Sequence, residues 1–194
     1  MADVFQVLKR DHDEVKAMLA ELEEGPKAAT GGATAEQLAS RQRLVERVII
    51  EESRHETAEQ QYFWPALRQL GRDGNRVADL AIEQEVEAEL ALSDLSKLDV
   101  GDREFDEVLA AFTAGARAHI LFEEANAWPL LEASINADEA EALGDMIIQA
   151  KAVAPTRPHP HTPPARGAAS AGAAFQGLSD RLRDVATGRG RAEP

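Results

Sequence analysis

One motif occurs twice in this chain, and it constrains the fold more than any other feature. The motif is a His-x3-Glu pair followed closely by Trp-Pro, and its two copies contain the only two tryptophans of the sequence. A repeat at one fixed offset indicates a duplicated helix pair and a bundle with pseudo-twofold symmetry. The matching residues, 64 positions apart, are His55 and His119, Glu59 and Glu123, Trp64 and Trp128, and Pro65 and Pro129.

The segments around both copies have the composition of helices. Hydrophobic residues make up 44% of the chain and aromatic residues 5%, and Ala and Leu, which favour helices, dominate the apolar set. Gly25-Pro26 marks a helix end, Thr34 with Gln37 forms a capping-box pattern, and Asp102 can cap a further helix. The expected helices cover about 3–24, 34–70 (with a kink or last-turn adjustment at Pro65), 76–98, 102–133 and 137–152.

The last 40 residues differ in composition from the rest. Residues 154–172 are rich in Pro, Ala, Gly and Ser, which is typical of an extended or disordered linker, and residues 175–186 fit one short amphipathic helix. From residue 151 the chain has seven Lys/Arg and three Asp/Glu, so this basic tail could lie on the acidic body. We predict an all-α protein: an up-down four-helix bundle with an additional short helix over 1–152, and a C-terminal extension over 153–194.

Charge and composition exclude several functions. The formal net charge of −14 disfavours binding to nucleic acid or to anionic membrane surfaces. The absence of cysteine excludes disulfides, thiolate metal sites and cysteine nucleophiles, so any metal must be held by His and carboxylate groups. No apolar stretch is long enough to span a bilayer, and the N-terminus does not resemble a signal peptide. We therefore expect a cytoplasmic protein that is a monomer or a weak dimer.

Helical spacing places the repeated pairs on the inward face. Residues i and i+4 lie one turn apart, so each His-x3-Glu presents an imidazole and a carboxylate side by side. Both pairs interrupt apolar stripes with the period of a core seam. Buried carboxylates need protons or cations, and His is the only base in either stripe. The stripes are Val45, Val48, Glu52, His55, Glu59, Tyr62 and Ala66, and Leu109, Phe112, Ala116, His119, Glu123, Asn126 and Leu130.

The other two long helices each add one inward group. His12 lies on the seam of Phe5, Leu8, Val15, Leu19 and Leu22, and Glu85 on the seam of Ala78, Ala81, Ala88, Leu92 and Leu95. Three histidines and three glutamates are then expected to converge, a mixture that suits two iron or manganese ions with carboxylates between them. The predicted metal ligands are His12, His55, Glu59, Glu85, His119 and Glu123.

Several of these residues also allow a simpler interpretation. A single seam histidine such as His12 is often just a core residue, and Glu85 belongs to an acidic run that could form a solvated face. Glu52 could orient an imidazole or lie at the edge of the bundle. Tyr62 could donate a hydrogen bond to a metal-bound oxygen, although packing is its more common role. His159 and His161 have the sequence context of loop residues.

The residues around these positions resemble the hemerythrin-like family, also called the HHE cation-binding domain. The resemblance covers about residues 1–150 and is carried by Leu8–Val15 and by the two segments that contain the repeated motif. It implies a four-helix bundle with an oxo- or hydroxo-bridged non-haem di-iron centre, in which Glu59 and Glu123 take the positions of the bridging carboxylates. Manganese or a mixed metal pair would fit the same residues.

The sequence departs from the family at one position, because the family usually has His where Glu85 stands. A carboxylate there favours the ferric state, so reversible oxygen transport becomes less expected than peroxide decomposition or ferrous oxidation by a catalase-, peroxidase- or ferroxidase-like oxidoreductase. Loss of a ligand at one metal is the opposite possibility. The partners expected are O₂, H₂O₂, NO and Fe²⁺. Two further hypotheses stay open: iron storage or O₂/NO sensing without turnover, and a structural helical interaction module.

Overall fold

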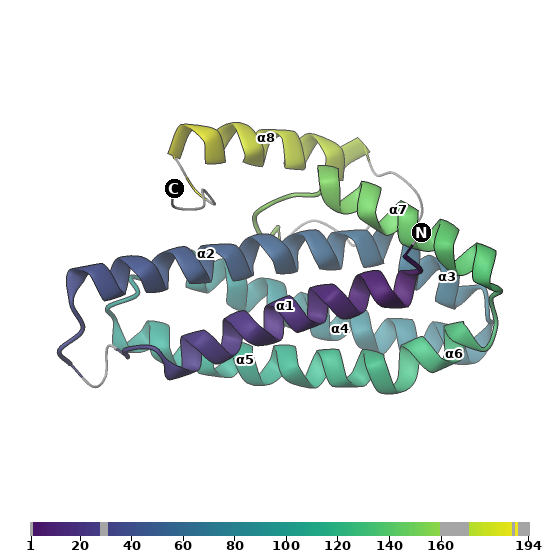
Figure 1. The fold of residues 1–194 in the computed structure, drawn as a ribbon, viewed down its shortest axis with the longest axis horizontal. Coiled ribbons are helices and arrows are strands. Elements are labelled where there is room, and N and C mark those ends of the chain that lie inside the picture. The colour runs from purple at the N-terminus through teal and green to yellow at the C-terminus, as the bar shows by residue number, and fades with distance from the viewer. Residues whose placement is uncertain (1, 28–30, 160–170, 188, 190–194) are drawn as a thin grey trace.

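The computed structural model describes residues 2–27, 31–159, 171–187 and 189. All regular secondary structure within these residues is helical. Four long helical rods run alternately up and down, and two further helices lie along one side of them (Figure 1). Each rod contacts its neighbours in the ring formed by α1, α2, α4 and α5. The prediction of an all-α up-down four-helix bundle is confirmed.

Two of the four rods are interrupted by a short π-helical turn. The helices of the first half are α1 (Val4–Glu24), α2 (Ala35–Ala58), the π turn η2 (Glu59–Phe63) and α3 (Trp64–Arg68). Those of the second half are α4 (Arg72–Leu95), α5 (Arg103–Phe122), the π turn η3 (Glu123–Ala127) and α6 (Trp128–Glu132). The added helices are α7 (Ala137–Val153) and α8 (Ala171–Thr187).

The helix ends follow the predicted signals in most places. The capping box of Thr34 and Gln37 is present, and Pro65 lies in the first turn of α3, directly after the π turn η2. The helix expected from residue 76 begins earlier, at Arg72. Gly74 lies inside this helix, and a side chain there would collide with the carbonyl oxygen of Leu67. Its role is therefore to allow close packing rather than chain reversal.

The π turns change which residues point inward beyond the repeated glutamates. Each turn contains an i→i+5 backbone bond, from Trp64 N–H to Glu59 O and from Trp128 N–H to Glu123 O. The extra residue advances the seam by one position. The prediction that Tyr62, Ala66, Asn126 and Leu130 continue the seams is therefore wrong: the buried residues are Phe63, Leu67, Ala127 and Leu131.

A polar layer divides the core of the bundle into two apolar clusters. One cluster surrounds Trp64 and includes Leu8, Ala81 and side chains of α7. The other surrounds Phe105 and includes Val15 and Leu92. On α1 and α4 the residues that separate the clusters are His12 and Glu85, one helical turn or more from the apolar residues on either side. The packing of both clusters thus fixes the position of the polar layer between them.

The two added helices are attached by different means. α7 packs against α1 and α2, whereas α8 contacts α7. Gly177 lets α8 approach closely, because a side chain there would collide with the carbonyl oxygen of Val153. Side chains after α7 bind acidic groups of α8, as when Thr156 Oγ1 donates to Asp184 at 2.5 Å. The tail is therefore tied mainly to its own preceding segment and to α7.

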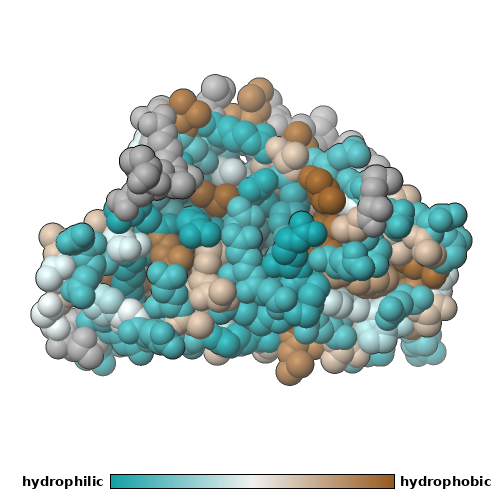
Figure 2. Space-filling view, viewed as in Figure 1, coloured by the Kyte–Doolittle hydropathy of each residue, from teal (hydrophilic) through white to brown (hydrophobic). Residues whose placement is uncertain are grey.

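The predicted tail elements agree in part with this arrangement. Residues 154–159 form no regular helix, and α8 begins at Ala171, earlier than the predicted residue 175. Leu178 and Val185 share the outward face of α8 and are 56% and 68% exposed. The view in Figure 2 shows a mainly hydrophilic face with hydrophobic side chains near α7 and α8. A domain boundary at residue 153 stays a prediction, and His161 lies outside the described residues.

No helix among the described residues combines the length and the apolar character that crossing a membrane requires.

Candidate metal centre

The six predicted ligands converge in the polar layer of the bundle. All of them are buried residues, each at most 6% exposed, and Glu59, Glu85 and Glu123 are fully buried. Their oxygen and nitrogen atoms form two overlapping groups, each with all ligand atoms within 4.8 Å of one another. Glu59 and Glu123 belong to both groups. The first group adds His12 and His55, and the second adds Glu85 and His119.

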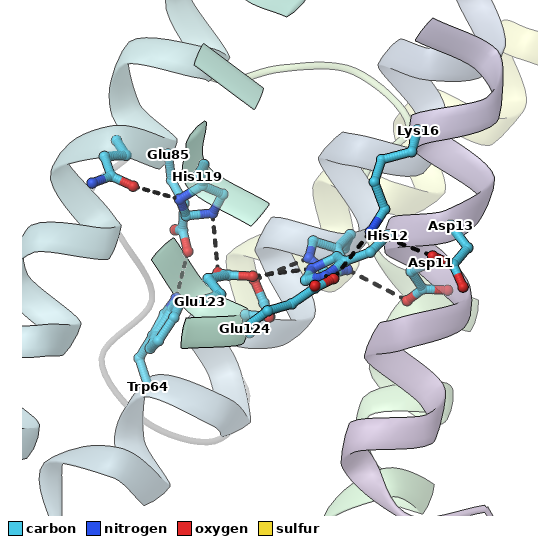
Figure 3. Close-up of polar contacts among 12 residues, drawn as sticks. Asp11, His12, Asp13, Lys16, Trp64, Glu85, His119, Glu123 and Glu124 are labelled. Atoms are coloured by element: carbon cyan, nitrogen blue, oxygen red, sulfur yellow. Dashed lines mark hydrogen bonds and ion pairs between the residues drawn. The ribbon is translucent and has the colours of Figure 1, made fainter. Parts of the chain in front are cut away.

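Glu123 lies between two imidazoles from different helices. Its Oε2 is 3.0 Å from His12 Nε2, and its Oε1 is 3.0 Å from His119 Nε2 (Figure 3). In the other half of the site, Glu59 Oε2 is 3.2 Å from His55 Nε2. Thus the Nε2 atoms of all three histidines face shared carboxylates at the centre of the cluster.

These central atoms are close together but poorly hydrogen-bonded. Among the described residues, Nε2 of His12 and of His119 and both carboxylate oxygens of Glu59 and Glu123 have no partner with hydrogen-bond geometry. Burying such groups without partners is costly, whereas a cation placed among them would satisfy them together. The mixture of imidazole and carboxylate donors is one that iron and manganese accept. The donor set therefore fits a pair of metal ions.

Each histidine uses its other ring nitrogen to contact an acceptor outside the cluster. His12 Nδ1 is 3.1 Å from Glu124 Oε1, His55 Nδ1 is 3.4 Å from Asp11 Oδ2, and His119 Nδ1 is 2.9 Å from Gln84 Oε1. An acceptor at Nδ1 favours the tautomer that leaves Nε2 with a free lone pair, which is the form that binds metal. The arrangement thus orients all three imidazoles toward the centre.

Sequence reasoning missed these three acceptors. Asp11 and Gln84 directly precede His12 and Glu85, and Glu124 directly follows Glu123, so adjacency to a candidate ligand was the available signal. Lysines bind two of the acceptors: Lys16 Nζ is 3.1 Å from Glu124 Oε1, and Lys151 Nζ is 2.6 Å from Asp11 Oδ1.

Glu85 has two hydrogen-bond donors of its own. Gln60 Nε2 donates to Glu85 Oε2 at 2.7 Å, and Trp64 Nε1 donates to Glu85 Oε1. The inward orientation predicted for Glu85 from its seam is therefore the one observed. Its place in a run of acidic residues did not put it on the solvated face.

Burial and mutual repulsion control the protonation of the cluster. Burial, assisted by Glu59, raises the pKa of Glu85 to about 8. Burial alone would lower the pKa of His119, but Glu123 reverses this effect and raises it to about 9. Burial alone would raise the pKa of Glu123, but His119 and His12 hold it well below its usual value. Without a cation, protons are thus bound where a metal would otherwise supply positive charge.

The roles predicted for Glu52 and Tyr62 stay predictions. Glu52 is buried, and burial raises its pKa, but the acceptors at the three Nδ1 atoms are other residues. Tyr62 is half-buried and packs against the apolar cluster around Trp64. His159 lies away from the site in the tail, with its Nε2 3.1 Å from Asp180 Oδ2.

A buried glutamate that the sequence did not single out lies beside the cluster. Glu56 is 1% exposed, and neither of its carboxylate oxygens has a hydrogen-bond partner among the described residues. Burial, together with Glu52, Glu85 and Glu89, raises the pKa of Glu56 well above its usual value. These surroundings therefore favour the protonated form of this carboxyl group.

Comparisons with known proteins agree with this fold. A solved structure of a hemerythrin HHE cation-binding domain-containing protein from Mycobacterium kansasii superposes with a TM-score of 0.66. Its sequence is 20% identical, and the superposition covers 98% of this chain and 96% of that chain, a likeness that shows the fold. A search of curated proteins found no match. The sequence profile of the hemerythrin HHE cation-binding domain matches residues 3–131. The chain belongs to the hemerythrin HHE cation-binding domain family.

Proposed function

We propose that this protein is a non-haem di-iron protein that reacts with peroxide or O₂, by peroxide decomposition or ferrous oxidation rather than oxygen transport. The observation that carries the proposal is the overlap of two buried donor groups that share Glu59 and Glu123. Two carboxylates common to both groups fit a pair of adjacent cations better than a single one. Bound iron would supply the exchange of electrons with the oxidant.

The residues of the chain suit small substrates and proton-dependent chemistry. The candidate ligands are almost wholly buried, so only molecules of the size of O₂, H₂O₂ or Fe²⁺ are expected to reach them. Reduction of peroxide to water consumes protons, and Glu56, whose pKa burial raises well above its usual value, lies beside the cluster. Glu85 adds negative charge to one donor group, which favours the ferric state and disfavours the stable diferrous state that reversible oxygen transport requires.

The proposal is tested on aerobically purified protein by iron analysis, visible absorption, and assays of peroxide consumption and ferrous oxidation. We expect close to two irons per chain, an absorption band from oxygen-to-iron charge transfer, and turnover in at least one assay. The variant with His55→Ala and His119→Ala should lose both iron and turnover. Bound iron without turnover would contradict the proposed reaction and favour storage or sensing. A chain that binds no iron would contradict the metal centre itself.

A further inference from the structure

The two copies of the repeat surround the cluster with matched positions of opposite hydrogen-bond polarity. Positions 60 and 124 are 64 residues apart and directly follow the repeated glutamates. At one of them the amide of Gln60 donates to Glu85 at 2.7 Å, and at the other the carboxylate of Glu124 faces His12 Nδ1 at 3.1 Å. Gln60 is thus a donor that faces the carboxylate brought into the site by α4. Glu124 is an acceptor that faces the imidazole brought in by α1.

The repeated tryptophans differ in the same way. The indole N–H of Trp64 donates to Glu85, whereas the ring of Trp128 stacks on the imidazole of His12 with centroids 5.0 Å apart and planes at 15°. Trp128 Nε1 has no hydrogen-bond partner among the described residues. Both oxygens of Glu85 therefore have a donor from the second rod. The two donors around Glu85 suit a carboxylate. The glutamate that stands where the family usually has His is thus accompanied by neighbours that fit it.

Because α4 brings Glu85 into the site where α1 brings His12, the two ends of the cluster are chemically unequal. The first donor group offers two imidazoles and two carboxylates, whereas the second offers one imidazole and three carboxylates. Imidazole ligands suit Fe²⁺ and Co²⁺, whereas sites dominated by carboxylates suit harder cations such as Mn²⁺. All the groups concerned are buried, so solvent does little to reduce the difference.

We propose that Gln60 and Trp64 are positioning residues for Glu85, and that together they make this end of the cluster a carboxylate-rich site that prefers a hard cation such as Fe³⁺ or Mn²⁺. The histidine-rich end, with His12 and His55, takes a softer cation of the Fe²⁺ or Co²⁺ class. This inference rests on the proposed metal centre and deepens it by assigning different cation preferences to its two halves.

A pair of substitutions tests the positioning role through metal binding alone. Gln60→Glu places a second carboxylate beside Glu85, and the affinity for the second Mn²⁺ or Co²⁺ ion should fall by ~10–100-fold, as for other partners of metal ligands. Adding Glu85→His reproduces the His12–Glu124 pairing and should restore most of that affinity. The exposed Gln69→Glu is the matched control, and binding of the first Co²⁺ ion shows that each variant is folded. Unchanged binding in Gln60→Glu, or no recovery in the double variant, overturns the positioning role.

Cation preference is measured by equilibrating metal-free protein with equimolar Mn²⁺ and Co²⁺ and determining both metals after removal of the unbound ions. We expect close to one of each per chain in the wild type. In the double variant, whose two ends both carry two imidazoles, the share of Mn²⁺ should fall by about tenfold, the effect of exchanging one ligand for a softer one. Equal shares in the two proteins would overturn the inference while leaving the proposed reaction intact. Two bound metals with the expected shares but without peroxide or ferrous turnover would contradict the proposed reaction and leave the inference intact.

Discussion

At the scale of single residues, Glu56 is a candidate proton donor for the proposed reaction. Its carboxyl group is buried beside the cluster, and burial with the neighbouring carboxylates raises its pKa, which favours the protonated form. Glu56→Gln preserves the shape of the side chain but removes the transferable proton. We expect turnover to fall by about 100-fold, a usual contribution of general acid catalysis, with the metal content unchanged. The check is peroxide consumption per bound iron.

The exposed Glu36→Gln, also in α2, is the control for this substitution and should have no effect. Turnover that is unchanged in Glu56→Gln would show that Glu56 is only a neutral packing residue. Loss of metal in the same variant would show instead that it binds a cation.

Protonation of the cluster predicts how the metal-free protein responds to pH. Glu85 and His119 have folded-state pKa values raised to about 8 and about 9 from 4.5 and 6.5. Both groups bind more protons in the folded state, so their stabilising contribution is complete at low pH and is lost as pH rises through these values. The midpoint of thermal unfolding of metal-free protein should drop by at least ~3 °C between pH 6 and pH 9, equivalent to ~1 kcal/mol.

Bound metal should remove this loss, because the cation replaces the protons. Scanning calorimetry of metal-free and metal-loaded protein over the same pH range makes the comparison. A metal-free protein that becomes more stable toward pH 9 would contradict the protonation assigned to the cluster.

Much of the site could be predicted at this scale. The six inward groups follow from seam periodicity and the repeat, because a helix places every third or fourth residue on one face. The Nδ1 acceptors could not be predicted in the same way. Asp11 and Gln84 are off the seam and reach the histidines only because neighbouring helices meet at a particular angle and height, which is a property of the packed bundle.

At the scale of elements, the π turns η2 and η3 determine how the repeated glutamates relate to the core beyond them. They could not be predicted from helical periodicity, because the sequence carries no direct mark of an i→i+5 bond. The indirect signal was apolar character one position late: Ala127 is more suited to burial than Asn126, and Phe63 and Leu67 more than Tyr62 and Ala66. Such turns are frequent at functional sites, and here each begins at a candidate ligand.

Inserting one Ala after the exposed Ala125 should rotate everything after it by one position, because η3 already accommodates one extra residue. Leu131, fully buried in the native protein, would leave the core. We expect the free energy of unfolding to fall by ~2–5 kcal/mol, as for removal of a large core side chain. Chemical denaturation provides the measurement. Ala125→Ser keeps the residue count and should change stability little. An insertion variant as stable as the wild type would show that the register set by η3 is not needed for the core.

At the scale of the whole molecule, α7 lies outside the segment that the family profile matches, and yet it contacts the surroundings of the candidate metal centre. Lys151 in α7 binds Asp11 at 2.6 Å, and Asp11 in turn contacts His55. Burial alone would raise the pKa of Asp11, but His55 and Lys151 lower it to about 2, so this carboxylate stays charged. The fifth helix, expected only as an addition to the bundle, thus supports a candidate ligand.

Lys151→Met should lower metal affinity by ~10-fold, because Asp11 loses the partner that holds it against His55. The variant Lys151→Arg keeps the charge and should recover part of the loss. Lys97→Met, at a side chain that is 65% exposed, is the matched control. Metal titration of the three variants gives the comparison, and equal affinities for the Lys151→Met and Lys97→Met variants would refute a role for α7 in the site.

The central claim is that two metal ions lie side by side between Glu59 and Glu123. Anomalous X-ray diffraction from crystals of the metal-loaded protein, measured at the absorption edge of the bound metal, tests it most directly. We predict two adjacent peaks that share both glutamates, one also contacted by His12 and His55 and the other by Glu85 and His119. A single peak, or peaks away from these six side chains, would contradict the account.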